Sequence, residues 1–192
     1  MDPISVYILC GGKSSRMLTE KGLVLFQGKP FVEHIISAVL PLTQTIFLVT
    51  DNKEYDYLPY PKIKDLIQDK GPLGGIYTAL ADSKTEINLI LSCDVPLITT
   101  EALLQLIEKH DESAAVTVLA SESRIHPLIG IYTKSILTKV ERAVKEELLK
   151  LRDFITTVPH QIISFEERET FQFTNINTPD ELDQITNHLN SI

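Results

Sequence analysis

Two adjacent glycines, Gly11 and Gly12, follow an apolar run at residues 4–9 and precede two cations, Arg16 and Lys21. Glycine has no Cβ atom, so backbone N–H groups can approach an anion closely, and arginine and lysine neutralise phosphate charge. These residue types at the end of a strand favour a phosphate-binding loop. A plain tight turn with solvated cations is the alternative, because glycine is common in turns.

The spacing of this loop excludes two widespread phosphate-binding signatures. Residues 8–30 contain neither Gly-x-x-x-x-Gly-Lys-[Ser/Thr] nor Gly-x-Gly-x-x-Gly. An NAD-dependent oxidoreductase is therefore not expected.

Carboxylate and amide side chains stand where other elements end. Asp94 follows an apolar run at 87–92, where its oxygens could hold a hard cation such as Mg²⁺ or cap a turn. Asp65 precedes a glycine-rich helix start and could instead form an Asx-turn. Asn175 and Asn177, two residues apart, point the same way if their segment is extended. They could grip a ligand or serve as turn and cap residues.

The elements that position these side chains alternate between strands and helices. Apolar runs predict strands at 4–9, 45–50, 87–92 and 114–119, and periodicity predicts helices at 29–40, 72–83 and 99–110, with Thr99 or Thr100 capping the last. This order predicts a right-handed, mostly parallel, three-layer α/β sheet. Ligands of such sheets bind outside the carboxyl ends of the strands, where the opening loop and Asp94 lie.

The last third of the sequence is less regular. It predicts a long amphipathic helix at 135–155, in one piece or two, strands at 161–165 and 170–176, and a final helix at 178–190. Without repeats, low-complexity segments or a linker, residues 1–192 are expected to form a single domain.

Composition narrows the class of partner. The 192 residues carry a net charge of −8, from 18 basic and 26 acidic side chains, which disfavours nucleic acid as the main partner. Cys10 and Cys93 stand in no disulfide or metal-binding pattern and are expected to be buried thiols. The start Met1-Asp2-Pro3 resembles no signal peptide, and no apolar stretch approaches the roughly 18 residues of a membrane span. A cytoplasmic protein without membrane contact is expected.

Residues 9–30, "LCGGKSSRMLTEKGLVLFQGKP", resemble the Leu-x-Gly-Gly-x-Ser-x-Arg-Met-Gly-x-x-Lys opening of the small nucleotidyltransferases with a Rossmann-like fold. Within that group, the closest resemblance is to the molybdenum cofactor guanylyltransferases. Leu18 stands where the family usually has glycine, and Glu20 where it has aspartate. The resemblance continues at "GKPFVEHI" (28–35), "DLIQDKGPLGGIYTAL" (65–80), "LSCDVPLI" (91–98), "HPLIGIY" (126–132) and "FTNINTPDEL" (173–182).

The resemblance implies a single-domain nucleotidyltransferase, with an N-terminal part that binds the nucleotide and a C-terminal part that mainly binds the acceptor. The implied enzyme transfers GMP from GTP to the terminal phosphate of molybdenum-molybdopterin, forms molybdopterin guanine dinucleotide and releases pyrophosphate. The implied cofactor is Mg²⁺, and the implied substrates are GTP and molybdopterin. Transient contacts with cofactor-biosynthesis proteins or molybdoenzyme chaperones are also expected.

The resemblance also implies roles for individual residues. The catalytic group comprises Arg16, Lys21 and Asp94, and Asp94 is the implied metal ligand. Asp65 is the implied reader of guanine, with Asp69 as a nearby competitor, and His126 is implied to lie near the acceptor pocket. Asn175 and Asn177 are implied to bind the acceptor. The implied GTP-binding residues are Leu9, Cys10, Gly11, Gly12, Lys21, Asp65, Gly71, Gly75 and Asp94.

Two other functions remain open at this point. A cytidylyltransferase acting on molybdopterin or another phosphorylated small molecule would keep the chemistry and change the base. A non-catalytic nucleotide-binding relative would keep the fold without turnover, and Leu18 and Glu20 are its only support in the sequence.

Overall fold

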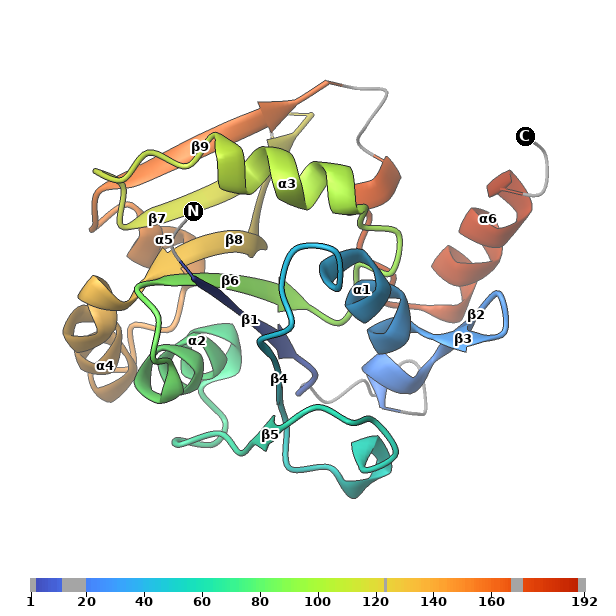
Figure 1. Ribbon diagram of the computed structural model, residues 1–192, viewed down its shortest axis with the longest axis horizontal. Coiled ribbons are helices and arrows are strands. Elements are labelled where there is room, and N and C mark those ends of the chain that lie inside the picture. The colour runs from blue at the N-terminus through green and yellow to red at the C-terminus, as the bar shows by residue number, and fades with distance from the viewer. Residues whose placement is uncertain (1–2, 12–19, 123, 167–170, 190–192) are drawn as a thin grey trace.

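A seven-stranded sheet forms the centre of the computed structural model, which describes residues 3–11, 20–122, 124–166 and 171–189 (Figure 1). The strand order is β5-β4-β1-β6-β8-β7-β9. Only β8 (Arg124–Thr133) runs against the other strands of this sheet. The predicted mostly parallel sheet is confirmed. The parallel strands are β1 (Ile4–Leu9), β4 (Ile46–Val49), β5 (Lys62–Ile63), β6 (Ile87–Ser92), β7 (Val116–Ser121) and β9 (His160–Phe165).

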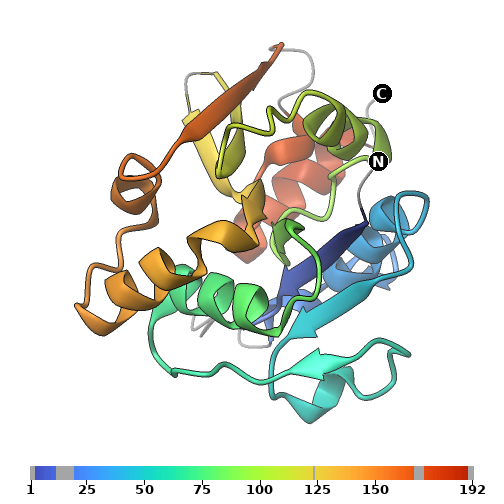
Figure 2. The ribbon, with the colours of Figure 1, turned by 60° about the vertical axis from the view of Figure 1, so that its left-hand side comes forward.

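Helices cover both faces of the sheet, which confirms the three predicted layers (Figures 1 and 2). Alternate residues of β1 point to opposite faces. Val6 and Ile8 are buried in the core beneath α1 (Phe31–Val39) and α3 (Thr100–Glu108). Tyr7 and Leu9 belong to the opposite core, under α2 (Gly71–Asp82), α4 (Leu137–Lys145) and α5 (Leu151–Ile155). In Figure 2, the green α2 and the orange α4 lie side by side.

The order of the strands reverses between β1 and β6. From β1 the chain moves outward to β4 and β5, and α2 then carries it back to β6 on the other side of β1. The connections that leave the carboxyl ends of β1 and β6 therefore diverge. In open α/β sheets, this switch point is where ligands bind.

The predicted helices form, with small shifts at their ends. The Thr99 hydroxyl accepts a hydrogen bond from the Ala102 N–H (3.2 Å) and caps α3. Helix α1 begins at Phe31 because Lys29–Pro30 forms β3, which pairs with β2 (Leu25–Phe26). The amphipathic stretch 135–155 divides into α4 and α5, with Glu147 in the left-handed region (φ +59°) between them.

Strand β8 was not predicted as a strand, and its sequence explains why. Pro127 interrupts the alternation of side chains, and the pairing with β7 shifts register between Val118 and Leu119. A bulge of this kind accommodates a proline that cannot join the hydrogen-bond ladder. A Cβ at Gly130 would lie 2.9 Å from the Thr117 carbonyl oxygen, so the close approach of β7 and β8 needs glycine there.

The strand predicted at 170–176 is wrong for the described residues. Residues 171–173 form a 3-10 turn, and 174–177 have no regular structure. Phe173 and Ile176 are both fully buried, but they lie three residues apart and enter different cores. The apparent alternation in this stretch therefore does not describe one face of a strand.

The chain then forms α6 (Pro179–Leu189), beside the β2–β3 ribbon (Figure 1). Ile176 and Ile185 pack there with Val24, Phe26 and Phe31. This third core attaches the C-terminal segment to the start of α1. None of the helices in the described segments has the length and apolar character needed to cross a bilayer.

Candidate active site

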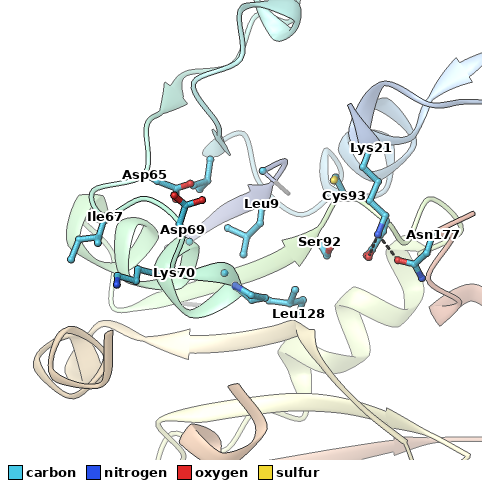
Figure 3. Close-up of a pocket in the computed structure, with 16 residues that line it drawn as sticks. Leu9, Lys21, Asp65, Ile67, Asp69, Lys70, Ser92, Cys93, Leu128 and Asn177 are labelled. Carbon is cyan, nitrogen blue, oxygen red and sulfur yellow. Dashed lines mark hydrogen bonds and ion pairs between the residues drawn. The ribbon is translucent and has the colours of Figure 1, made fainter. Parts of the chain in front are cut away.

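A cavity of about 730 Å³ opens at the β1–β6 switch point (Figure 3). The carboxyl ends of β1, β4 and β6, strand β8 and the connections that follow β5 and β9 contribute to its walls. Polar groups lie at both ends of the cavity, and Leu9 lies between them. The lining residues are Leu9, Gly11, Lys21, Val49, Asp65, Ile67, Asp69, Lys70, Gly71, Pro72, Gly75, Ser92, Cys93, Asp94, Leu128 and Asn177.

Four side chains from distant parts of the sequence meet at one end of this cavity. The Lys21 ammonium donates to Asp94 Oδ2 (2.7 Å) and to Asn177 Oδ1 (2.5 Å). The Asn175 amide also donates to Asp94 Oδ2 (3.1 Å). The Lys21 and Asp94 side chains are only 18% and 10% exposed, so water screens their charges less than it would at the surface.

Contacts of the backbone fix the positions of Asn175 and Asn177. The residue between these two asparagines, Ile176, donates its N–H to the Asp94 carbonyl (2.9 Å), and its side chain is fully buried. Glu181 Oε2 accepts from the Asn177 N–H (2.6 Å) and the Thr178 N–H (3.1 Å). The Thr178 hydroxyl accepts in return from the Glu181 N–H (3.2 Å), which completes a capping box at the start of α6.

Asp94 keeps one carboxylate oxygen free. Its Oδ1 atom is buried and has no hydrogen-bond partner among the described residues, whereas Oδ2 accepts hydrogen bonds from Lys21 and Asn175. A buried anionic oxygen without a partner is costly, and a cation would satisfy it. Mg²⁺ often takes only one or two carboxylates, together with phosphate oxygens and water. The site fits Mg²⁺ in this respect, and the described residues hold no cluster of three or more potential ligands that would suit a metal bound by protein alone.

Asp65 lies toward the other end of the cavity, beside Asp69 (Figure 3). Its Oδ1 accepts a long hydrogen bond from the Thr78 hydroxyl (3.5 Å), and its Oδ2 lies 3.7 Å from the place of a Cβ on Gly11. Burial raises the pKa of Asp65 above its usual range, and Thr78 partly opposes the effect. The desolvated carboxylate would gain from N–H donors on a ligand.

Two glycines keep the middle of the cavity open. A Cβ on Gly75 would lie 3.1 Å from Leu9 Cδ1, so a larger residue would push Leu9 into the space. Gly71 adopts a φ of +56° at the first residue of α2, a conformation that glycine takes without strain. The start of α2 therefore borders the cavity, where Gly71, Pro72 and Gly75 are among the lining residues.

The two cysteines are not nucleophiles. Cys10 is fully buried on the α1–α3 face, where its thiol donates to the Ile8 carbonyl, and its N–H donates to Val49. Cys93 lines the cavity and is 2% exposed. Burial raises the pKa of both thiols, so both stay protonated at neutral pH.

The structure gathers most of the residues singled out from the sequence. Gly12 and Arg16 lie outside the described residues, and Cys10 does not line the cavity. Asn175 lines a second, smaller pocket that adjoins Asp94. The cavity-lining residues predicted from the sequence are Leu9, Gly11, Lys21, Asp65, Gly71, Gly75, Asp94 and Asn177.

Sequence reasoning missed several cavity residues. Ser92 and Cys93 precede Asp94, and Lys70 and Pro72 flank Gly71, so adjacency to the predicted residues was a usable signal. Leu128 gave no such signal, because it belongs to β8, whose return to the edge of β6 was not predicted.

Comparison with known proteins adds independent information. The MobA-like NTP transferase domain family matches residues 6–162. A Flavobacterium johnsoniae protein named "Probable molybdenum cofactor guanylyltransferase" is 61% identical over 98% of this chain and 100% of its own length. A Carboxydothermus hydrogenoformans protein with the same name is 37% identical over 96% of each chain. The crystal structure of molybdopterin-guanine dinucleotide biosynthesis protein A from Archaeoglobus fulgidus has the same fold, with a TM-score of 0.81, 22% identity and coverage of 98% of this chain and 100% of that one.

Proposed function

The chain belongs to the MobA-like NTP transferase family, and from this premise we propose that it transfers GMP from GTP to the terminal phosphate of molybdenum-molybdopterin. The products are molybdopterin guanine dinucleotide and pyrophosphate. The full-length similarity to the F. johnsoniae relative supports this function. We also propose that residues 1–192 act as one domain, in which the N-terminal part binds GTP and the C-terminal part mainly binds the acceptor.

The cluster of Lys21, Asp94, Asn175 and Asn177 is the observation that carries the proposal. It brings a cation, a carboxylate with an unpartnered oxygen and two amides to the switch point of the sheet. A reaction between two anions needs this combination, because both phosphates must be oriented and their repulsion reduced.

The reaction needs no strong general base. A phosphate monoester has a second pKa of about 6, so the acceptor is mostly a dianion at neutral pH. One of its oxygens forms a bond to the α-phosphorus of GTP, the bond from that phosphorus to the bridging oxygen breaks, and pyrophosphate leaves with the electron pair. The chain's part is to position the phosphates and to neutralise charge.

Lys21 has the central role among the described residues. We propose that its ammonium, held by Asp94 and Asn177, moves onto the α-phosphate when GTP binds. Mg²⁺ would be held by Asp94 and would supply positive charge to the nucleotide phosphates. Arg16 is proposed to bear on the β- and γ-phosphates, on the strength of the sequence alone.

The remaining proposed roles depend on the end of the cavity at which each residue lies. Asp65 is proposed to accept hydrogen bonds from guanine N1–H and its exocyclic amine. Its place at the cavity wall and the absence of a short hydrogen bond to its carboxylate among the described residues favour this role. Asn175 and Asn177 are proposed to orient the acceptor phosphate. Leu9, Cys10, Gly11, Gly12, Gly71 and Gly75 are proposed to approach the nucleotide mainly through backbone.

We place this reaction in the cytoplasm, where GTP is supplied. Molybdopterin is sensitive to oxidation, so we also propose that transient protein contacts deliver it and receive the product. GTP and molybdopterin remain the substrates on which the chemistry depends.

Calorimetric titration of GTP and CTP with Mg²⁺ tests the proposal directly. We expect the wild-type protein to bind GTP more tightly than CTP, and Asp94→Ala to weaken GTP binding in Mg²⁺ but much less in EDTA. Lys64→Ala is the control, because Lys64 is 63% exposed and pairs with Asp51 outside the cavity lining. Preference for CTP would contradict guanylyl transfer, and failure to bind either nucleotide would contradict nucleotidyl transfer altogether.

A further inference from the structure

The backbone beside Lys21 is in close contact with a buried tyrosine. Gly22 follows Lys21 in a short 3-10 turn, η1 (Lys21–Leu23), and is buried there. A Cβ on Gly22 would lie 2.5 Å from Tyr55 Oη and 3.3 Å from the ring atoms Cε1 and Cζ. A Cβ atom does not tolerate a contact under 3.0 Å, so this position has to be glycine while Tyr55 is in place.

The contact at Gly22 is limited by space and not by backbone strain. Among the described glycines, only Gly28 and Gly71 adopt a positive φ. Alanine at Gly22 would therefore suit the local backbone, and the three atoms nearest to its Cβ would all belong to Tyr55. The tyrosine, above all its hydroxyl oxygen, is thus the neighbour that decides where the Gly22 backbone can lie.

Tyr55 is itself held firmly in place. It ends a second 3-10 turn, η2 (Lys53–Tyr55), which lies beyond the end of β4. The Asn52 side chain caps this turn by accepting from the Glu54 N–H (2.9 Å), and the Asn52 N–H donates to the Thr50 hydroxyl (3.1 Å). The Tyr55 side chain is fully buried in the core beneath α1 and α3. A ring packed in this way transmits its position to the groups that it touches.

The hydroxyl of Tyr55 is buried at a cost to stability. Its Oη atom has no hydrogen-bond partner among the residues that the structure describes. Burial raises the pKa of this hydroxyl, so it stays protonated and uncharged. An unpartnered buried hydroxyl is unfavourable, and a phenylalanine would fill the same place without that penalty. The hydroxyl therefore needs an explanation other than folding, and its contact with Gly22 offers one.

We infer that Tyr55 is a positioning residue for the transfer reaction, an inference that rests on the proposed function. Its hydroxyl oxygen presses on Gly22 and so sets the η1 backbone from which the Lys21 side chain extends. That side chain reaches Asp94 and Asn177 at the cavity wall. Tyr55 is not among the described residues that line the cavity, so its effect on the reaction passes through Lys21. A misplaced charge loses much of its effect on a transition state, which makes a contact behind the site matter to the rate.

A pair of substitutions tests the contact through kcat at saturating GTP, Mg²⁺ and molybdenum-molybdopterin. We expect Gly22→Ala to lower kcat about tenfold, because the new methyl group meets Tyr55 Oη and displaces the turn. Adding Tyr55→Phe to this variant should restore most of the loss, since phenylalanine lacks the closest atom and the ring carbons at 3.3 Å need only a small shift. Tyr57→Phe is the matched control and should restore nothing, because Tyr57 is 55% exposed and its hydroxyl donates to Glu33 (3.0 Å).

The single variant Tyr55→Phe gives a readout that does not depend on whether Gly22→Ala folds. We expect it to lower kcat about fivefold, while the free energy of unfolding by urea stays the same or rises. In a Lys21→Ala background the same substitution should leave kcat unchanged, because the residue through which it acts is gone. The inference is overturned if Tyr55→Phe leaves kcat unchanged in the wild-type background, or if it lowers kcat equally in both backgrounds.

Calorimetric titration of GTP with Mg²⁺ separates this inference from the proposed function. Because Lys21 is proposed to meet the α-phosphate, Gly22→Ala should raise the Kd for GTP several-fold, and Tyr55→Phe should reverse that rise. If the wild-type protein bound GTP but transferred nothing to molybdopterin, the proposed function would fail, and these Kd values would decide whether Tyr55 acts on Lys21. Equal Kd values in all the variants would then overturn the inference, and a wild-type protein that bound no GTP would overturn both.

Discussion

At the scale of the residue, the unequal surroundings of the two Asp94 oxygens explain how one carboxylate can serve two purposes. Oδ2 accepts hydrogen bonds from Lys21 and Asn175, and Oδ1 is buried without a partner in the part of the chain that the structure describes. The ion pair holds the Lys21 ammonium at the wall of the cavity, where we propose that a nucleotide phosphate binds. The free oxygen leaves Asp94 ready for a cation without breaking that pair.

Removing either member of the pair should slow turnover without unfolding the protein. We expect Lys21→Ala and Asp94→Ala each to lower kcat about 10²–10³-fold, because a preorganised charge at a developing anion is worth that much. The double variant should lose less than the product of the two effects, since the residues act as one unit. Rates of pyrophosphate release at saturating Mg²⁺, together with circular dichroism, measure this. Near-wild-type turnover in either single variant would refute the assigned roles.

At the scale of the element, the strands and helices that follow a simple period were predictable, including β9 and α6, whereas β8 and the path of residues 171–177 were not. In β1 and β6, successive side chains enter two different buried cores. Both faces of these strands are therefore apolar, and the sequence shows each strand as a continuous apolar run. Pro127 and Gly130 concealed β8, because its bulge and close packing depend on β7. Residues 170–176 were predicted as a strand, but the described part of this segment has no strand. It docks beyond the end of β6 through the hydrogen bond from the Ile176 N–H to the Asp94 carbonyl, a contact that the local sequence does not encode.

The same distinction applies to the site. Asp65, Lys21 and Asp94 follow directly from strand ends and glycines, whereas Arg152 reaches the smaller pocket that adjoins Asp94 only because α5 packs beside the start of β8. No local pattern of residue types predicts the contact between Arg152 and the Ile125 carbonyl. Leu128 and Arg152, which tertiary packing places at their pockets, therefore gave no signal in the sequence, whereas the missed residues Ser92 and Lys70 adjoin predicted ones.

The capping box of α6 should support turnover as well as stability. Glu181→Ala removes the acceptor of the Asn177 and Thr178 N–H groups, and we expect it to lower the free energy of unfolding by about 1 kcal/mol. It should also lower kcat several-fold by loosening Asn177 beside Lys21. Urea titration and steady-state kinetics measure the two effects.

Asp183→Ala on the exposed side of the same helix is the control, and it should change neither quantity. If Glu181→Ala destabilised the protein but left kcat and both KM values unchanged, the capping box would serve the helix alone.

At the scale of the whole molecule, two histidines in separate places are held neutral by burial. Burial lowers the pKa of both His110 and His126. His110 Nδ1 lies 2.8 Å from the Thr117 hydroxyl, and its Nε2 is buried with no partner among the residues that the structure describes. The folded protein therefore takes up protons on these rings only at lower pH than the unfolded chain does.

Stability should fall as the pH is lowered from 7.5 to 6. In that window the unfolded chain binds more protons than the folded protein, so the free energy of unfolding decreases with decreasing pH. Urea midpoints at several pH values measure the slope. We expect His110→Gln to flatten it. A slope that is the same in the wild-type protein and in His110→Gln would show that His110 does not contribute.

The hydrogen bond from Ile176 to the Asp94 carbonyl has a consequence for the order in which the protein is made. Residues 6–162, the part that matches the family, are synthesised before Asn175 and Asn177. Because chains begin to fold from the N-terminal side during synthesis, the strands and helices that form most of the cavity can assemble before residues 175–177 dock on Asp94. A chain at that stage lacks the amides beside Lys21 and Asp94, so the four-residue cluster is completed last.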